Sequence, residues 1–443
     1  MEDQEFERNE QMLEARRLKR LEQKRRRQMQ QRIVLGVLAV ILILVIVLIV
    51  RGCKSGKAGQ EDAVQKPAQT DTQDNTPQEP ADEPDTVVTL AAVGDIMVYD
   101  EQIDAAKQSD GSYDFSTCFS AVSALTMGAD LTVGNLELNF CGEPYSGRPD
   151  FRAPEALALA LKEKGFDLVQ TANTYSIQNG ISGLKSTIKY LNTVGIDHVG
   201  TYAAKDDKET NDGVLLKNVN GIKIAFIAYT KGLNNISVPE GSEYCVDLLY
   251  KDYDSEYKEV NKDAIVKSVK AAKALSPDLI VAMLHWGSEW DTTVVSTQDK
   301  ITDLLLTNGV DIILGSHPHV VGEMKQVPVT TVDGQQKTCF VAYSLGNFLS
   351  SPDSQKYDYA MESLILNLQI TKNGSTGETA LTGISYTPLY ILKTESDVEG
   401  TRYQVVPIRS AINNNLFPEM NDAFTAAIAH LRTNTASDYD SGK

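Results

Sequence analysis

The chain has 443 residues, of which 42% are hydrophobic, so it can form a buried core, in two or three domains or in one large domain with appendages. Its 60 acidic and 42 basic side chains give a formal net charge of −18 at pH 7, and residues 52–443 alone carry −22. This acidic excess argues against a nucleic-acid partner and against docking on anionic lipid, because both of those surfaces attract basic proteins.

The N-terminal region predicts a membrane anchor. Residues 1–32 hold ten basic and seven acidic side chains, whereas residues 33–50, IVLGVLAVILILVIVLIV, hold no charge. A helix of this length rises about 27 Å, close to the hydrocarbon thickness of a bilayer. The alternative, a cleaved signal peptide, is disfavoured because the apolar run is long and no A-x-A-like site follows it. By the positive-inside rule, we predict a single-pass cell-membrane protein with residues 1–32 in the cytoplasm and the main domain extracellular.

Residues 51–86 separate the predicted transmembrane helix from the rest of the chain. This stretch is rich in Gln, Asp, Pro and Thr and contains no aromatic residue. Such a composition cannot bury enough apolar surface to offset the entropy lost on ordering. We therefore predict a disordered acidic stalk that holds the folded domain away from the membrane.

Residues 87–415 predict one α/β domain. Short apolar runs, beginning with VVTLAAVGD, alternate with helical patterns such as EALALALKEKG, which is typical of β–α–β units that feed a mostly buried sheet. Asn220-Gly221 lies between two apolar runs and predicts a β-hairpin. Residues 416–443 predict a last amphipathic helix followed by a tail.

Polar side chains follow many of the apolar runs, at the points where the predicted strands end. In sheets built from β–α–β units, ligands collect beyond the carboxyl ends of the strands, so we expect these side chains to converge on one site. Three of the chain's five histidines are among them. The set consists of Asp95, Asn135, Glu137, Asn173, His285, Glu289, His317, His319, Ser344 and Asn347.

Two chemistries suit such a set. Imidazole and carboxylate groups together are ligands for Zn, Mn or Fe, and one or two such metal ions would activate water and bind the oxygens of a phosphoryl group. In the metal-free alternative, His and Glu act as general acid and base, while Asn side chains and backbone N–H groups hold an anion.

Seven motifs in chain order carry a family resemblance. AVGDIM, GNLE, TAN, GIDHVGTY, HWGSEW, GSHPHVV and YSLGNF resemble the CapA family of bacterial capsule synthesis proteins, which is associated with poly-γ-glutamate production. The resemblance covers about residues 87–410. CapA domains are in turn similar to calcineurin-like metallophosphoesterases, which implies a layered α/β sheet fold flanked by helices.

The resemblance implies a role for each residue of the site. Asp95, Glu137, His285, His317 and His319 match metal ligands, and His285, Glu289 and His317 are the implied catalytic residues. Glu289 would lie behind the ligands or act as an acid or base. Asn347 would line the pocket. We also predict substrate contacts for Asn135, Asn173, Tyr175, Trp286 and Ser344, with two alternatives: Trp286 is a pocket wall or part of the core, and Asn135 holds the loop of Glu137.

Two motifs depart from the family pattern. ANTYSIQNG stands where the family reads like A-N-N-H-x-x-D-x-G, so Thr174, Tyr175 and Gln178 replace Asn, His and Asp. Met97 stands where phosphoesterases have a histidine. Thr and Tyr are poorer ligands for a divalent metal than Asn and His. A one-metal site, a repurposed binding pocket and a weakened enzyme all fit these departures.

The resemblance implies a role in the synthesis, export or attachment of an anionic capsule polymer such as poly-γ-glutamate. The reaction would be metal-assisted hydrolysis or transfer at a phosphoester or amide-type bond. The alternative is a non-enzymatic accessory subunit that binds the polymer or positions a membrane-bound polymer synthase. Because the domain is acidic, binding of an anionic polymer needs bound cations or a local basic pocket, for which Arg148, Arg152 and Lys231 are the candidates.

Overall fold

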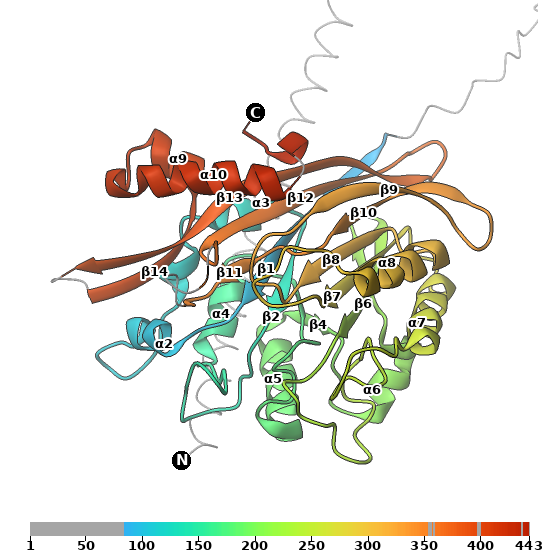
Figure 1. Ribbon diagram of the computed structural model, residues 1–443, viewed down its shortest axis with the longest axis horizontal. Coiled ribbons are helices and arrows are strands. Elements are labelled where there is room, and N and C mark those ends of the chain that lie inside the picture. The colour runs from blue at the N-terminus through green and yellow to red at the C-terminus, as the bar shows by residue number, and fades with distance from the viewer. Residues whose placement is uncertain (1–83, 353–356, 358, 397–399, 436, 443) are drawn as a thin grey trace, which may run out of the picture. The chain divides into compact units, whose positions relative to one another are not determined.

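The computed structural model describes residues 84–443 except 353–356, 358, 397–399, 436 and 443 (Figure 1). The predicted cytoplasmic segment and transmembrane helix, and the predicted stalk up to residue 83, lie outside the described residues. Among the helices that are described, none is long and apolar enough to cross a membrane.

The first sheet has eight strands, and on one side of β1 the strands β2, β3 and β4 follow in order, all parallel to it. Its order is β14-β13-β12-β1-β2-β3-β4, with β11 also paired to β1, and β12, β13 and β14 are antiparallel to their neighbours. The strands are β1 (Thr86–Ile96), β2 (Leu131–Leu136), β3 (Leu168–Gln170), β4 (Asp197–Val199), β11 (Asn347–Leu349), β12 (Glu362–Lys372), β13 (Thr379–Ser396) and β14 (Gly400–Pro407).

The second sheet has six strands in the order β5-β6-β7-β8-β10-β9. Its four central strands are parallel, and each edge strand is joined to its neighbour by a hairpin. The hairpin predicted at Asn220-Gly221 is confirmed, and both residues have the positive φ that such a turn requires. The strands are β5 (Leu215–Val219), β6 (Ile222–Thr230), β7 (Leu279–His285), β8 (Ile312–Ser316), β9 (Met324–Thr330) and β10 (Gln336–Ala342).

The two sheets pack face to face, and the alternation of side chains along each strand explains why. In β1, Leu90 belongs to the core between the sheets, whereas its neighbour Ala91 faces the opposite side. In β7, Val281 belongs to the core between the sheets, and its neighbour Ile280 faces the opposite side. Successive side chains of a strand point to opposite faces, so these continuous apolar runs make strands that are buried on both sides.

Helices cover the outer faces of both sheets. Leu157 of α4 packs on the first sheet, and Ile265 of α7 and Leu305 of α8 pack on the second. Phe424 of α10 belongs to a smaller core with β13 and β14, along which α9 and α10 lie (Figure 1). The helices are α2 (Asp100–Ala106), α3 (Ser123–Gly128), α4 (Ala156–Glu163), α5 (Gly180–Val194), α6 (Lys205–Glu209), α7 (Lys262–Ala274), α8 (Ser296–Asn308), α9 (Ile408–Asn413) and α10 (Asn421–Asn434). The expected mixed α/β fold with layered sheets is thus confirmed.

Close backbone contacts bring the two sheets together at the carboxyl ends of their parallel strands. A Cβ atom on Gly94 would lie 1.9 Å from the Gly346 carbonyl oxygen, and one on Gly315 would lie 2.1 Å from that of Tyr343. Only glycine, which has no Cβ atom, allows the two backbone segments to come this close. The segment between β10 and β11 therefore crosses the ends of β1 and β8, and Asn347 pairs with Asp95.

Candidate metal centre

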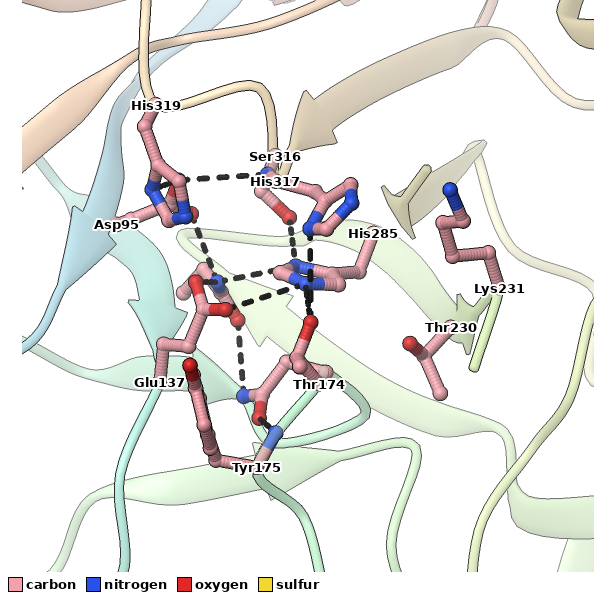
Figure 2. A network of polar contacts seen from close by, with 12 residues as sticks. Asp95, Glu137, Thr174, Tyr175, Thr230, Lys231, His285, Ser316, His317 and His319 are labelled. Atoms are coloured by element: carbon pink, nitrogen blue, oxygen red, sulfur yellow. Dashed lines mark hydrogen bonds and ion pairs between the residues drawn. The ribbon is translucent and has the colours of Figure 1, made fainter. Parts of the chain in front are cut away.

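Five side chains with metal-binding atoms meet at this edge of the two sheets (Figure 2). Asp95 lies near the end of β1 and Glu137 follows β2, both in the first sheet. The three imidazoles come from the second sheet, where His285 ends β7 and the other two follow β8. All five residues are at most 7% exposed. The structure thus brings together Asp95, Glu137, His285, His317 and His319.

The ligand atoms form three overlapping groups. In each group, one atom from each residue lies within 4.8 Å of the others. The groups are Glu137 with His285 and His317, Asp95 with Glu137 and His319, and Glu289 with His317 and His319. This mixture of imidazole and carboxylate suits Zn, Mn or Fe, and because the groups share members, one or two ions fit the same donors.

One buried oxygen of the donor set lacks a hydrogen-bond partner. It is Glu137 Oε1, which lies 3.3 Å from His285 Nε2. A buried carboxylate oxygen without a partner costs free energy. A divalent cation between Glu137 and the imidazoles would compensate it. The residues present therefore fit a metal ion.

Two asparagines hold the carboxylates in place. Asn135 Nδ2 donates to Asp95 Oδ1 at 2.7 Å and to Glu137 Oε2 at 3.2 Å. Asn173 Nδ2 donates in turn to Asn135 Oδ1 at 3.2 Å and to the Leu136 carbonyl at 2.7 Å. Both asparagines are buried. They orient the ligands, as outer-shell partners of metal sites do, and they lie behind the carboxylates, whereas the sequence assigned them to the substrate.

Hydrogen bonds also fix the imidazoles. Ser316 Oγ lies 3.0 Å from His285 Nδ1, and His319 Nδ1 lies 3.1 Å from Asp95 Oδ2 and 3.0 Å from Asn347 Oδ1. Asn347 thereby joins the centre. Ser316 was missed at the sequence level, although its place directly before His317 at the end of an apolar run is the same signal that identified the other strand ends.

Burial and neighbouring charges shift the pKa values of the ligand side chains in different directions. Burial alone would raise the pKa of Asp95, but the contact with His319 holds it below its ordinary value. Burial disfavours the charged form of His319, whereas its hydrogen bond to Asp95 and the charge of Glu137 raise its pKa to about 9. Burial and the other imidazoles lower the pKa of His317 well below the usual range. His317 is therefore neutral, the form that binds a metal.

The altered motif lies at the centre. Thr174 Oγ1 lies 2.9 Å from His285 Nε2 and 3.5 Å from His317 Nδ1, so a hydroxyl stands between two imidazoles. The Tyr175 hydroxyl points toward Glu137 (Figure 2), and burial followed by the charge of Glu137 raises its pKa. Gln178 instead accepts a hydrogen bond from Asn234 at 2.9 Å, away from the cluster.

Three residues named at the sequence level do not face the site. Trp286 is fully buried in the core of the second sheet, where it stacks on Tyr343 and donates to its carbonyl at 3.0 Å. Ser344 Oγ donates to the Val320 carbonyl at 2.7 Å. The guanidinium of Arg152 donates to the carbonyls of residues 141–143, which makes it a clamp for that loop. The structure therefore gives these side chains structural roles.

Glu289 and Trp290 lie at the exposed side of the site, which we call its mouth. Glu289 is exposed, and Trp290 stacks on Tyr357, with ring centroids 4.0 Å apart, while lying 5.1 Å from the His319 ring. Trp290, His317 and His319 have φ of +62°, +94° and +59°, a region that bulky residues rarely adopt. Strained backbone of this kind gathers at functional sites.

Fold and site together define a layered α/β protein with a buried histidine–carboxylate centre. Residues 89–352 match the family described as bacterial capsule synthesis protein PGA_cap, and the chain belongs to this family. The resemblance to CapA is confirmed by two relatives. Capsule biosynthesis protein CapA of Bacillus anthracis is 26% identical over 297 residues, covering 65% of each chain. PGA biosynthesis protein CapA of Bacillus subtilis is 26% identical over 307 residues, covering 68% of this chain and 72% of that protein.

Solved structures give more distant similarities. The calcineurin-like phosphoesterase YfkN of Bacillus subtilis is 14% identical, with a TM-score of 0.36, over 78% of this chain and 99% of that chain. The 5′-nucleotidase precursor of Thermus thermophilus is 13% identical, with a TM-score of 0.38, over 69% of this chain and 54% of that chain.

Proposed function

We propose that the protein acts on an anionic capsule polymer such as poly-γ-glutamate, by metal-dependent hydrolysis or transfer at an amide-type or phosphoester bond. The observation that carries this proposal is the buried cluster of five ligands around an unpartnered Glu137 oxygen. The family, whose described role is capsule synthesis, supports the choice of polymer.

Each residue has a defined task in this proposal. Asp95, Glu137, His285, His317 and His319 would hold the metal, which when bound supplies a Lewis acid and lowers the pKa of a bound water. Glu289 reaches the same cluster from the mouth, where its carboxylate can accept a proton from the attacking water and return it to the leaving nitrogen or oxygen. The Asn135 and Asn173 amides keep both buried carboxylates oriented.

A second function, that of a polymer-binding accessory subunit without catalysis, is favoured by one contact. The Thr174 hydroxyl lies 2.9 Å from His285 Nε2, the ring nitrogen that lies 3.3 Å from Glu137 Oε1. A threonine that holds this nitrogen weakens one ligand position. In this case the centre would bind the polymer, or the protein would position a membrane-bound synthase.

The deciding experiment measures metal and turnover in the same samples. The full-length chain is loaded with Mn, Zn or Fe, its metal content is determined, and poly-γ-glutamate is followed by chain length and by newly formed amino ends. The hydrolase proposal predicts bound metal and polymer cleavage, lost in Glu137→Gln. Glu289→Gln should retain the metal and lose turnover. Polymer binding without cleavage under every metal would favour the accessory subunit.

The proposal includes attachment to the cell membrane through residues 33–50, with residues 87–415 outside the cell. The uncharged run after a basic segment supports this arrangement. Protease added to intact cells should remove the domain, while a tag at the N-terminus stays protected. A domain that is digested only after the cells are broken would contradict the orientation.

A further inference from the structure

Lys231 lies at the mouth of the centre in a fixed position. It follows β6 directly, and Figure 2 shows its side chain alongside His317. Its Nζ donates to the Gly287 carbonyl at 2.6 Å and lies 4.9 Å from the centre of the Tyr257 ring. Its backbone N–H donates to the His285 carbonyl at 2.8 Å. These contacts hold the ammonium group beside the imidazoles.

The charge of Lys231 is not matched by a nearby carboxylate. Lys208 and Lys337 are also largely buried, and each has an aspartate oxygen 2.6 Å from its Nζ. Within the described part of the chain, Lys231 has no carboxylate within 4.0 Å. Burial lowers its pKa, and the charge of Glu289 opposes this from a greater distance. A half-buried cation without a counter-ion is stabilised when an anion arrives.

Arg148 is a second cation without a carboxylate partner, but unlike Lys231 it is exposed. Its side chain hydrogen-bonds Tyr357, the residue that stacks on Trp290. Because the Trp290 ring also lies 5.1 Å from the His319 ring, Arg148 is connected to the same side of the centre through Tyr357 and Trp290. It makes no ion pair with any carboxylate among the described residues. The two cations thus offer two anchoring points beside one centre.

We propose that Lys231, with Arg148, forms a subsite for the repeated carboxylate or phosphate groups of the anionic polymer. One such group would contact Lys231 beside His317, and another group of the same chain would contact Arg148. A ligand with a single negative charge would match only one of the two cations. This inference rests on the proposed function, since it locates the substrate at the metal centre.

The test uses labelled oligomers and matched variants of the full-length, metal-loaded chain. Binding of a γ-linked glutamate hexamer is compared with that of the same hexamer amidated at every α-carboxylate. Lys231→Met should weaken binding of the charged hexamer about tenfold or more, whereas Lys231→Arg should restore most of it. The matched control is Lys270→Met, which removes an exposed charge on α7 and should leave affinity unchanged. The amidated hexamer should bind weakly, and equally to all variants.

Two further arms separate the outcomes. A glycerol-phosphate oligomer of equal charge is tested alongside the glutamate hexamer. The oligomer whose anionic group fits the subsite better should lose more affinity in Lys231→Met. The inference is overturned when neither oligomer distinguishes Lys231→Met from Lys270→Met, or when the amidated hexamer binds as tightly as the charged one. Metal content is measured in parallel. Binding that depends on Lys231 in a chain that takes up no metal would retain the subsite and reject the hydrolase.

Discussion

Buried carboxylates in two regions of the protein are compensated in different ways. Near the C-terminus, the Asp440 side chain is fully buried, and both its oxygens have partners in Arg409, Arg432 and the Gly442 N–H. At the candidate metal centre, Asp95 and Glu137 are buried as deeply but meet imidazoles and amides, and Glu137 Oε1 has no hydrogen-bond partner. The first carboxylate is met by two arginines of the chain itself, whereas the second has an oxygen at which the proposed metal ion would bind.

The largest effect is expected at the centre. His317→Ala/His319→Ala removes imidazoles from all three ligand groups, so metal content should fall from near one equivalent to almost none. Any polymer cleavage should fall more than about a hundredfold, the upper range for losing a partner that only orients a ligand. Elemental analysis and the cleavage assay check this. His198→Asn, a histidine in β4 outside the cluster, is the control and should retain metal. Full metal content in the double variant would contradict the assignment of these histidines as metal ligands.

The second effect separates stability from metal binding. Asp440→Asn removes the carboxylate between two arginines and should lower the free energy of unfolding by about 1–3 kcal/mol, measured with urea, without changing metal content. Burial would raise the pKa of Asp440, but Arg409 and Arg432 hold it below its ordinary 3.8. The carboxylate's contribution is therefore complete above about pH 4 and disappears as the pH falls through the lower folded value. A stability difference that grows in acid would contradict this account.

The sequence predicted the convergence at the centre because the rule for strand ends is local. Asp95, Glu137 and His285 each end or follow an apolar run, and parallel strands bring such ends to one edge. The contact of Glu137 with His285 joins different sheets, and how two sheets stack depends on packing among distant residues. No pattern within either strand specifies that contact.

Two of the side chains named from the sequence lie away from the ligand cluster, for physical reasons. Trp286 follows His285 directly, and because successive side chains of a strand alternate, the tryptophan points into the core when the histidine points into the site. Arg152 looked available as a cation, but its guanidinium binds three carbonyls of a loop that contacts it only in the fold. Lys231 and Arg152 have equal charge in the sequence, and only the tertiary contacts distinguish them.

A smaller effect tests the partners behind the ligands. Ser316→Ala removes the hydroxyl that lies 3.0 Å from His285 Nδ1, so metal affinity should fall about tenfold as the ring loses its fixed orientation. Competition with a chelator of known affinity measures this change. Ser344→Ala is the matched control, because its hydroxyl donates to the Val320 carbonyl, and the metal affinity of that variant should not change. Equal losses in both variants would indicate general loosening of the fold.

A third way of burying a carboxylate uses neither a cation nor a metal site. Glu362, at the start of β12, is 8% exposed, and its Oε2 lies 2.5 Å from Nδ1 of His430 on α10. Burial raises the pKa of Glu362 from its ordinary 4.5 to about 8 and lowers that of His430. At neutral pH the folded protein therefore retains a proton on Glu362 that the unfolded chain releases.

The contribution of Glu362 to stability should then decline as the pH rises from about 4.5 to 8, because over this interval its carboxyl keeps a proton in the folded state that the unfolded chain releases. Glu362→Gln imitates the neutral acid and cannot ionise, so the variant should match the wild type near pH 4. It should exceed the wild type by about 1 kcal/mol or more at pH 9. Urea unfolding at the two pH values measures this difference. A variant that is less stable than the wild type at pH 9 would mean that Glu362 is ionised beside a protonated His430. The pair would then be an ion pair like that of Asp440 with its arginines.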